Sequence, residues 1–135
     1  MLYVKGDMQM NLRQETVIMG GDPAPNITIE EMKVLAEHAS TEREISVAFA
    51  AASNKSWWVE DKVYDYEEGT EEYKNACRIT DEWFKVSDIL KEKIFDILRG
   101  EGVIIPEKGQ IAVLSPFMER NGYRDGNGWW VKISK

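Results

Sequence analysis

The chain has 135 residues, of which 43% are hydrophobic and 30% are charged, and its formal net charge is −7. A chain of this length can bury a sizeable core without disulfides or metals, and its five tryptophans argue against intrinsic disorder. No stretch approaches the roughly eighteen apolar residues of a membrane-spanning helix, and the first residues lack the basic start and apolar core of a secretory signal. The composition therefore predicts one domain, residues 1–135, in the cytoplasm and without a membrane anchor.

The negative charge is concentrated in the middle of the chain. Residues 28–100 hold ten lysines and arginines against seventeen aspartates and glutamates, whereas residues 101–135 carry a slight positive excess. An acidic surface repels phosphate groups, so direct nucleic-acid binding is disfavoured and a basic protein is the expected partner. The single cysteine, Cys77, cannot form an internal disulfide, which fits a reducing compartment.

Short runs near the N-terminus predict β-strands. Residues 2–5 and 8–13 flank a Gly-Asp pair, and the second run alternates apolar and polar side chains, as is typical of a small hairpin. Residues 17–19 are a further candidate strand before a loop rich in glycine, proline and asparagine.

Two capping boxes mark the helices that follow this loop. In the Thr-x-x-Glu spacing, the hydroxyl and the carboxylate each bond a backbone N–H that the first helical turn leaves unpaired. The pairs are Thr28 with Glu31 and Thr41 with Glu44. At 100° per residue, the apolar side chains after the second box are rotated by roughly 140° from those after the first. We therefore expect a break between two helices near Ser40.

The longest periodic pattern spans residues 70–99. With Tyr73 at heptad position a, positions a and d are mostly apolar, and charged side chains occupy the opposite side. Thr70 is a suitable N-cap and Gly100 a suitable end. At about 1.5 Å per residue this helix is roughly 45 Å long. We expect the other elements to pack on it, with the alanine-rich run 48–52 in closest contact.

Two stretches leave alternatives open. Residues 53–69 fit either the continuation of a helix, which gives a helical hairpin, or a structured loop. In residues 111–118, Pro116 interrupts the helical spacing of the apolar side chains. Alternatively, Ser115 and Pro116 begin a short helix that ends near Asn121.

The C-terminal tail predicts a tight hairpin. Asp-Gly and Asn-Gly pairs separate two short aromatic-rich runs, and the last run places Trp129, Val131 and Ile133 on one face. We expect this strand to pair with the N-terminal strands. The predicted fold is α+β: a helical hairpin or three-helix core around one long helix, about residues 70–99, with a small antiparallel sheet from the N- and C-terminal strands.

Patterns for catalysis and metal binding are weak. The only histidine, His38, and the only cysteine cannot together supply a zinc site, and no nucleophile elbow, phosphate-binding loop or dinucleotide fingerprint is present. Carboxylate pairs such as Glu92 and Asp96 leave a Mg²⁺-dependent hydrolase as one alternative. We expect no metal, no cofactor and no catalytic residue.

The most distinctive charged feature precedes the long helix. Seven carboxylates fall between residues 60 and 72, diluted only by Lys62 and interspersed with aromatic side chains. Such a surface suits a basic groove in which aromatic side chains anchor the contact, whereas the alternative is a turn that is merely solvated. The candidate partner-binding residues are Trp57, Trp58, Glu60, Asp61, Asp65, Glu67, Glu68, Glu71 and Glu72.

The C-terminal region supports a rival function. A short helix followed by a hairpin, with basic residues nearby, is the outline of a winged-helix DNA-binding module. The candidate nucleic-acid-binding residues are Arg120, Arg124 and Lys132. Because the candidate helix carries a single arginine and a proline, a strand that completes a small sheet is the simpler interpretation.

Two segments, EWFKVSDILKEKIFDILRGEG and PFMERNGYRDGNGWW, about a quarter of the chain, resemble small uncharacterised accessory proteins of phages and conjugative elements. Small acidic proteins of such elements often bind and block a host defence machine, sometimes by imitating nucleic acid. The resemblance therefore implies an anti-CRISPR-like or DNA-mimic-like inhibitor of a basic, nucleic-acid-handling protein. The broad apolar stripe of so long a helix also makes a homodimer a candidate assembly.

Overall fold

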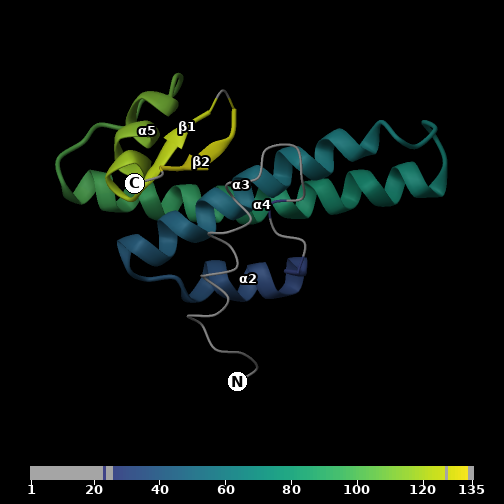
Figure 1. Ribbon diagram of the computed structural model, residues 1–135, viewed down its shortest axis with the longest axis horizontal. Helices are drawn as coiled ribbons and strands as arrows, with labels where there is room; N and C mark the ends of the chain where they lie inside the picture. The colour runs from purple at the N-terminus through teal and green to yellow at the C-terminus, as the bar shows by residue number, and fades with distance from the viewer. Residues whose placement is uncertain (1–22, 24–25, 127, 134–135) are drawn as a thin grey trace.

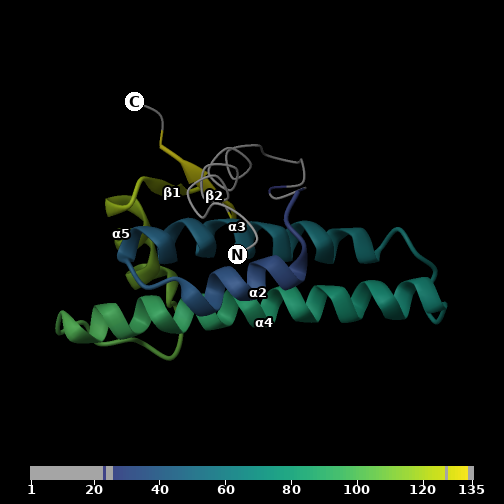
Figure 2. The same ribbon diagram turned by 90° about the horizontal axis from the view of Figure 1, so that it is seen from below.

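The computed structural model of the chain describes residues 23, 26–126 and 128–133. These residues form an α+β fold of four helices and one two-stranded antiparallel sheet. The elements are α2 (Ile29–His38), α3 (Glu42–Val63), α4 (Glu71–Gly100), α5 (Ile111–Arg120), β1 (Tyr123–Asp125) and β2 (Trp130–Lys132). Helices α3 and α4 lie side by side as a long hairpin, α2 packs along them, and α5 with the two strands lies at one end (Figure 1, Figure 2).

Both predicted capping boxes form, and they fix the starts of α2 and α3. The hydroxyl of Thr28 accepts a hydrogen bond from the N–H of Glu31 at 3.1 Å, and the Glu31 carboxylate accepts one from the N–H of Thr28 at 3.0 Å. Thr41 and Glu44 make the same reciprocal pair. Between the helices, Ala39 has extended backbone with ψ 121°, which confirms the predicted break.

Helix α4 is continuous over 30 residues, as predicted, and Thr70 caps its start. Its buried side chains include Trp83, Leu90 and Ile94 on the predicted stripe. Val86 and Phe95 lie off that stripe but are also buried. The buried face is wider than a single seam because α3 and α2 both pack on α4.

Residues 53–63 continue α3, and residues 64–70 form the turn into α4. The helical hairpin is therefore the observed alternative for this ambiguous stretch. The two helices cross closely, because Ala50 and Ala51 have no side chain beyond Cβ and are fully buried. Gly69 completes the turn with φ +90°, a conformation that only glycine adopts without steric cost.

A lysine attaches α2 to the long helix. The ammonium group of Lys93 in α4 donates hydrogen bonds to three backbone carbonyls at the end of α2: Ala36 at 2.6 Å, Ala39 at 2.7 Å and Glu37 at 3.1 Å. These carbonyls have no partner within their own helix, and the positive charge also suits the negative end of the helix dipole. Lys93 therefore fixes where the end of α2 lies on α4.

Helix α5 begins at Ile111, so of the two alternatives the helical spacing over residues 111–118 is observed and the start at Ser115 and Pro116 is wrong, while the predicted end near Asn121 is confirmed. Burial of Leu114 on the core side favours the earlier start. Pro116 lies inside the helix and cannot donate to the carbonyl of Ala112. Both residues are on the exposed side, where water can take the place of the missing hydrogen bond.

The C-terminal hairpin also forms, with Tyr123 opposite Lys132 and Asp125 opposite Trp130. Trp130 is its buried tryptophan, at 5% exposure, and lies on the face opposite Trp129, Val131 and Ile133. The predicted pairing of this strand with strands at 2–5, 8–13 and 17–19 lies outside the described residues.

No helix in the described residues is long and apolar enough to cross a membrane.

Candidate functional site

The predicted partner-binding residues gather around the turn between α3 and α4. We call residues 57–72 the tip. In both views the tip lies at the end of the molecule opposite α5 and the hairpin, and it projects beyond the start of α2 (Figure 1, Figure 2). The last two turns of α3, the turn itself and the start of α4 together place its side chains.

The carboxylates of the tip face solvent. Glu60 is half-buried, and the exposed ones are Asp61, Asp65, Glu67, Glu68, Glu71 and Glu72. Within the described residues they make one ion pair, between Glu71 and Lys74 at 3.8 Å, and both side chains are largely exposed. A pair of this kind contributes little, because solvent screens it. The tip therefore keeps most of its negative charge available to a partner.

Three aromatic side chains of the tip are also exposed. Tyr64 is 81% exposed, Trp57 49% and Tyr66 45%. The ring of Trp57 packs edge-on against Phe84 of α4, with the centroids 5.8 Å apart and an interplanar angle of 83°. Trp57 is therefore held in place while half of its surface stays accessible.

The neighbouring tryptophan is less available. Trp58 is half-buried, and the ammonium groups of Lys55 and Lys62 lie 5.0 and 5.2 Å from its ring centroid. These cation–π contacts come from one turn before and one turn after Trp58 on the same helix. Of the predicted tryptophan pair, Trp57 is the residue that a partner can reach.

Four of the tip residues form a stripe along one side of α3: Trp57, Glu60, Asp61 and Tyr64. Their spacing of three, four and seven residues places them on adjacent turns of one helix face. Tyr64 continues that face, because its backbone is still helical with φ −71° and ψ −8°. Tyr64 and Tyr66 are among the aromatic side chains that the sequence pattern offers as anchors of this contact, although the list of candidate partner-binding residues does not name them. Helical spacing is the signal that places Tyr64 on the stripe. That signal applies only where residues 53–63 are helical, and the sequence left this open.

Beside the tip, Tyr73 and Cys77 lie one turn apart on α4. The charge of Cys77 and a hydrogen bond to it raise the pKa of Tyr73 above its ordinary value of 10.0. A tyrosine is already protonated at neutral pH at its ordinary pKa, so with or without this shift Tyr73 adds no charge to the acidic surface.

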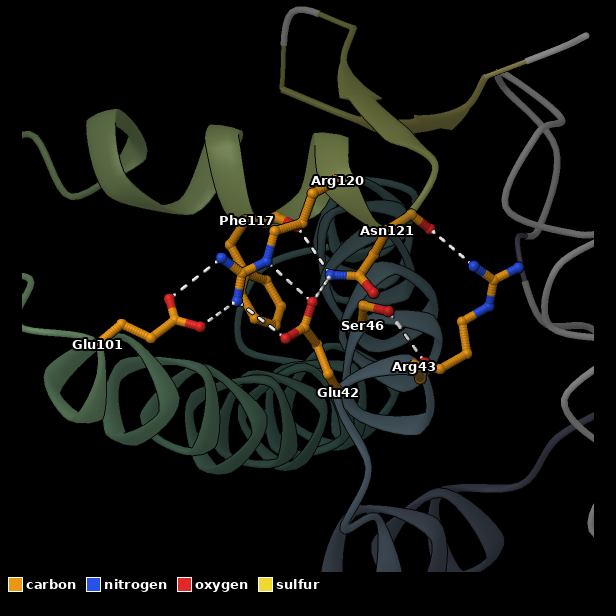
Figure 3. Close-up of polar contacts among 7 residues, drawn as sticks. All are labelled: Glu42, Arg43, Ser46, Glu101, Phe117, Arg120 and Asn121. Carbon is orange, nitrogen blue, oxygen red and sulfur yellow. Dashed lines mark hydrogen bonds and ion pairs between the residues drawn. The ribbon is translucent and has the colours of Figure 1, made fainter.

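The rival nucleic-acid site is partly occupied by internal contacts. Arg120 donates two hydrogen bonds to Glu42 at 2.9 Å each and two to Glu101 at 2.8 and 3.1 Å (Figure 3). Its ring contact is with Phe117, whose centroid is 4.9 Å from the guanidinium carbon. Asn121 donates further bonds to the Glu42 carboxylate at 2.8 Å and to the Phe117 carbonyl at 2.9 Å.

This network joins the end of α5 to the start of α3 and the end of α4. Hydrogen bonds from Arg120 and Asn121 lower the pKa of Glu42, and the two carboxylates raise the pKa of Arg120. Arg124 and Lys132 remain exposed on the hairpin. Arg120, the candidate nucleic-acid-binding residue on the helix, instead holds three elements together, so the geometry favours a structural role for it.

The carboxylate pair considered for Mg²⁺ also has an internal partner. Glu92 and Asp96 lie 3.8 and 3.0 Å from the guanidinium of Arg99 near the end of α4. Across the described part of the chain, no three His, Cys, Asp or Glu side chains come together in a group that could hold a metal ion. His38 lies exposed at the end of α2.

Comparison of the chain with protein-family models, with curated proteins and with solved structures found no match in any of the three.

Proposed function

We propose that this chain is a non-enzymatic interaction protein that docks on a basic protein through its tip. The observation that carries the proposal is the combination of six exposed carboxylates with exposed Trp57, Tyr64 and Tyr66 at the projecting end of a long helical hairpin. If these carboxylates served only to keep the turn hydrated, there would be no need for exposed aromatic side chains among them. The aromatic surface supplies the desolvated contact that holds a complex together, and the charge supplies orientation and a fast encounter.

The preferred partner is a protein whose basic groove handles nucleic acid. Such a groove is lined with lysine and arginine side chains that neutralise backbone phosphates. The tip likewise presents a run of negative charges, at the end of the α3–α4 hairpin. In this proposal it competes with nucleic acid for the lysine and arginine side chains of the groove. In this proposal the chain is an inhibitor from a phage or other mobile element, active in the host cytoplasm against a defence protein such as a restriction or RNA-guided nuclease.

Affinity capture with charge-reversed variants tests the proposal. In the tip variant Glu67, Glu68, Glu71 and Glu72 are changed to lysine. In the control variant Glu30, Glu37, Glu107 and Glu119, which are exposed elsewhere, are changed to lysine. The two variants have the same net charge. The tip variant replaces both first-turn glutamates of α4, Glu71 and Glu72, and the control replaces one first-turn glutamate of α2, Glu30. Any loss that depends on overall charge alone therefore affects both.

We expect the wild-type chain and the control variant to capture the same basic proteins, with less captured as salt rises, and the tip variant to lose them. A captured nuclease is then purified, and its activity is measured with each variant. Inhibition by the wild-type chain and the control, but not by the tip variant, is the expected result. Capture that is equal for the tip and control variants would show that the tip is not the docking surface.

A further inference from the structure

The stripe on α3 repeats, on the surface, a chemical arrangement that the chain uses internally. At the end of the molecule opposite the tip, the guanidinium of Arg120 lies over the ring of Phe117, 4.9 Å from the ring centroid. Glu42 and Glu101 each accept two of its hydrogen bonds (Figure 3). An aromatic ring and two carboxylates therefore surround one guanidinium. This combination satisfies the planar face of an arginine and its N–H groups together.

The stripe also combines aromatic rings with two carboxylates. Among the described residues, no contact between the stripe and an arginine of the chain itself is observed. Glu60 and Asp61 lie on the turn between Trp57 and Tyr64, and side chains on adjacent turns are about 5–6 Å apart. None of the ion pairs in the described part of the chain includes Glu60 or Asp61. The contact of Trp57 with Phe84 fixes the first ring before any partner binds, which reduces the entropy lost on docking.

We infer that the stripe Trp57, Glu60, Asp61 and Tyr64 binds arginine side chains of the partner in preference to lysine. The inference rests on the proposed function and narrows its partner to a protein segment that bears arginines. A guanidinium can stack flat on an aromatic ring and still present N–H groups in its plane to a carboxylate, whereas an ammonium is a compact, strongly hydrated charge. A surface of carboxylates alone would discriminate weakly between the two.

Titration of the full chain with two peptides of equal length and charge, nona-arginine and nona-lysine, tests this preference. Binding is followed by tryptophan fluorescence and by calorimetry at low salt. We expect both peptides to bind and nona-arginine to bind about fivefold more tightly, because a guanidinium can stack on a ring and donate to a carboxylate together, whereas a lysine ammonium on a ring lacks the planar N–H fork.

Two matched substitutions locate the preference. Tyr64→Ala removes an 81% exposed side chain from the stripe, so the fold is retained, and we expect the ratio between the peptides to fall below about twofold. Tyr66→Ala removes a tyrosine of the turn that lies off the stripe, so we expect it to weaken the binding of both peptides alike and to leave the ratio unchanged. Circular dichroism confirms that both variants keep the helical content of the wild-type chain.

The outcomes separate this inference from the proposed function. Equal affinity for the two peptides in the wild-type chain, or an equal loss of preference in both tyrosine variants, would overturn arginine selectivity by the stripe while leaving salt-dependent docking at the tip intact. Failure of both peptides to bind at low salt would contradict the proposed function as well, because no basic segment would then be attracted to the tip.

Discussion

Asn54 is the residue that attaches the C-terminal hairpin to the helices. Its side chain is fully buried in α3, and it donates to the carbonyl and accepts from the N–H of Trp130, both at 2.9 Å. We expect Asn54→Ala to lower the free energy of unfolding by about 3 kcal/mol, because two buried backbone groups lose their partner. Urea unfolding measures this loss. Asn75→Ala, the same change at an exposed position of α4, should stay within about 0.5 kcal/mol of the wild type, and an equally small effect at Asn54 would refute this role.

Glu42 adds a contribution to stability that acid removes. Hydrogen bonds from Arg120 and Asn121 hold its pKa below the ordinary value of 4.5. A carboxyl group with a lowered folded-state pKa stabilises the fold above its unfolded-state pKa, and that contribution is lost as pH falls through the folded-state value. Glu82, whose pKa is lowered by a hydrogen bond from Lys33, acts in the same direction.

Glu42→Gln is therefore expected to flatten the acid side of the stability profile. Below about pH 4.5 the urea midpoint of the wild-type chain should fall more steeply than that of the variant, which has no carboxylate to protonate at this site. The difference is expected to be modest, because Glu42 and Arg120 are each more than one third exposed and solvent screens their attraction. Parallel profiles for the two proteins over this range would mean that the Glu42 contacts do not contribute.

At the scale of elements, two glycines near the ends of α4, Gly69 before its start and Gly100 at its last residue, allow a test of the hairpin turn. Gly69 has φ +90° just before the helix, whereas Gly100 is the last residue of the helix, and a Cβ atom at either position meets no atom within 4 Å. The effect of alanine is thus decided by backbone conformation alone. We expect Gly69→Ala to destabilise the fold by about 1 kcal/mol and Gly100→Ala to stabilise it by up to about 1 kcal/mol. Thermal unfolding of both variants checks the opposite signs, and a shift in the same direction would contradict the turn geometry.

Elements with local signals could be predicted from the sequence, and elements decided by distant contacts could not. The capping boxes at Thr28 and Thr41 involve side chains three residues apart, so they marked α2 and α3 without knowledge of the fold. In contrast, the inward face of β2 is set by Asn54, which is 76 residues before Trp130. Pattern alone gave no reason to choose Trp130 over its neighbours.

The same distinction holds for the whole molecule and its candidate site. The acidic surface of the tip was predictable, because its carboxylates lie close in sequence and stay exposed. Arg120 was predicted as a nucleic-acid contact because its partners, Glu42 and Glu101, are 78 and 19 residues away in the chain. Tyr64 was predictable as one aromatic side chain among the carboxylates, but its place on the stripe was not, because that place depends on α3 continuing to Val63. The charge pattern therefore indicated the candidate site, and helix packing decides which side chains lie beside its carboxylates.

Amide hydrogen exchange of the full chain, alone and bound to the basic partner isolated by capture, tests docking through the tip most directly. Docking through the tip predicts slower exchange on binding across residues 57–72, while α5 and the hairpin at the opposite end exchange as in the free chain. Slower exchange in α5 and residues 123–133, with the tip unchanged, would contradict it and would place the interaction on the surface of the rival C-terminal site.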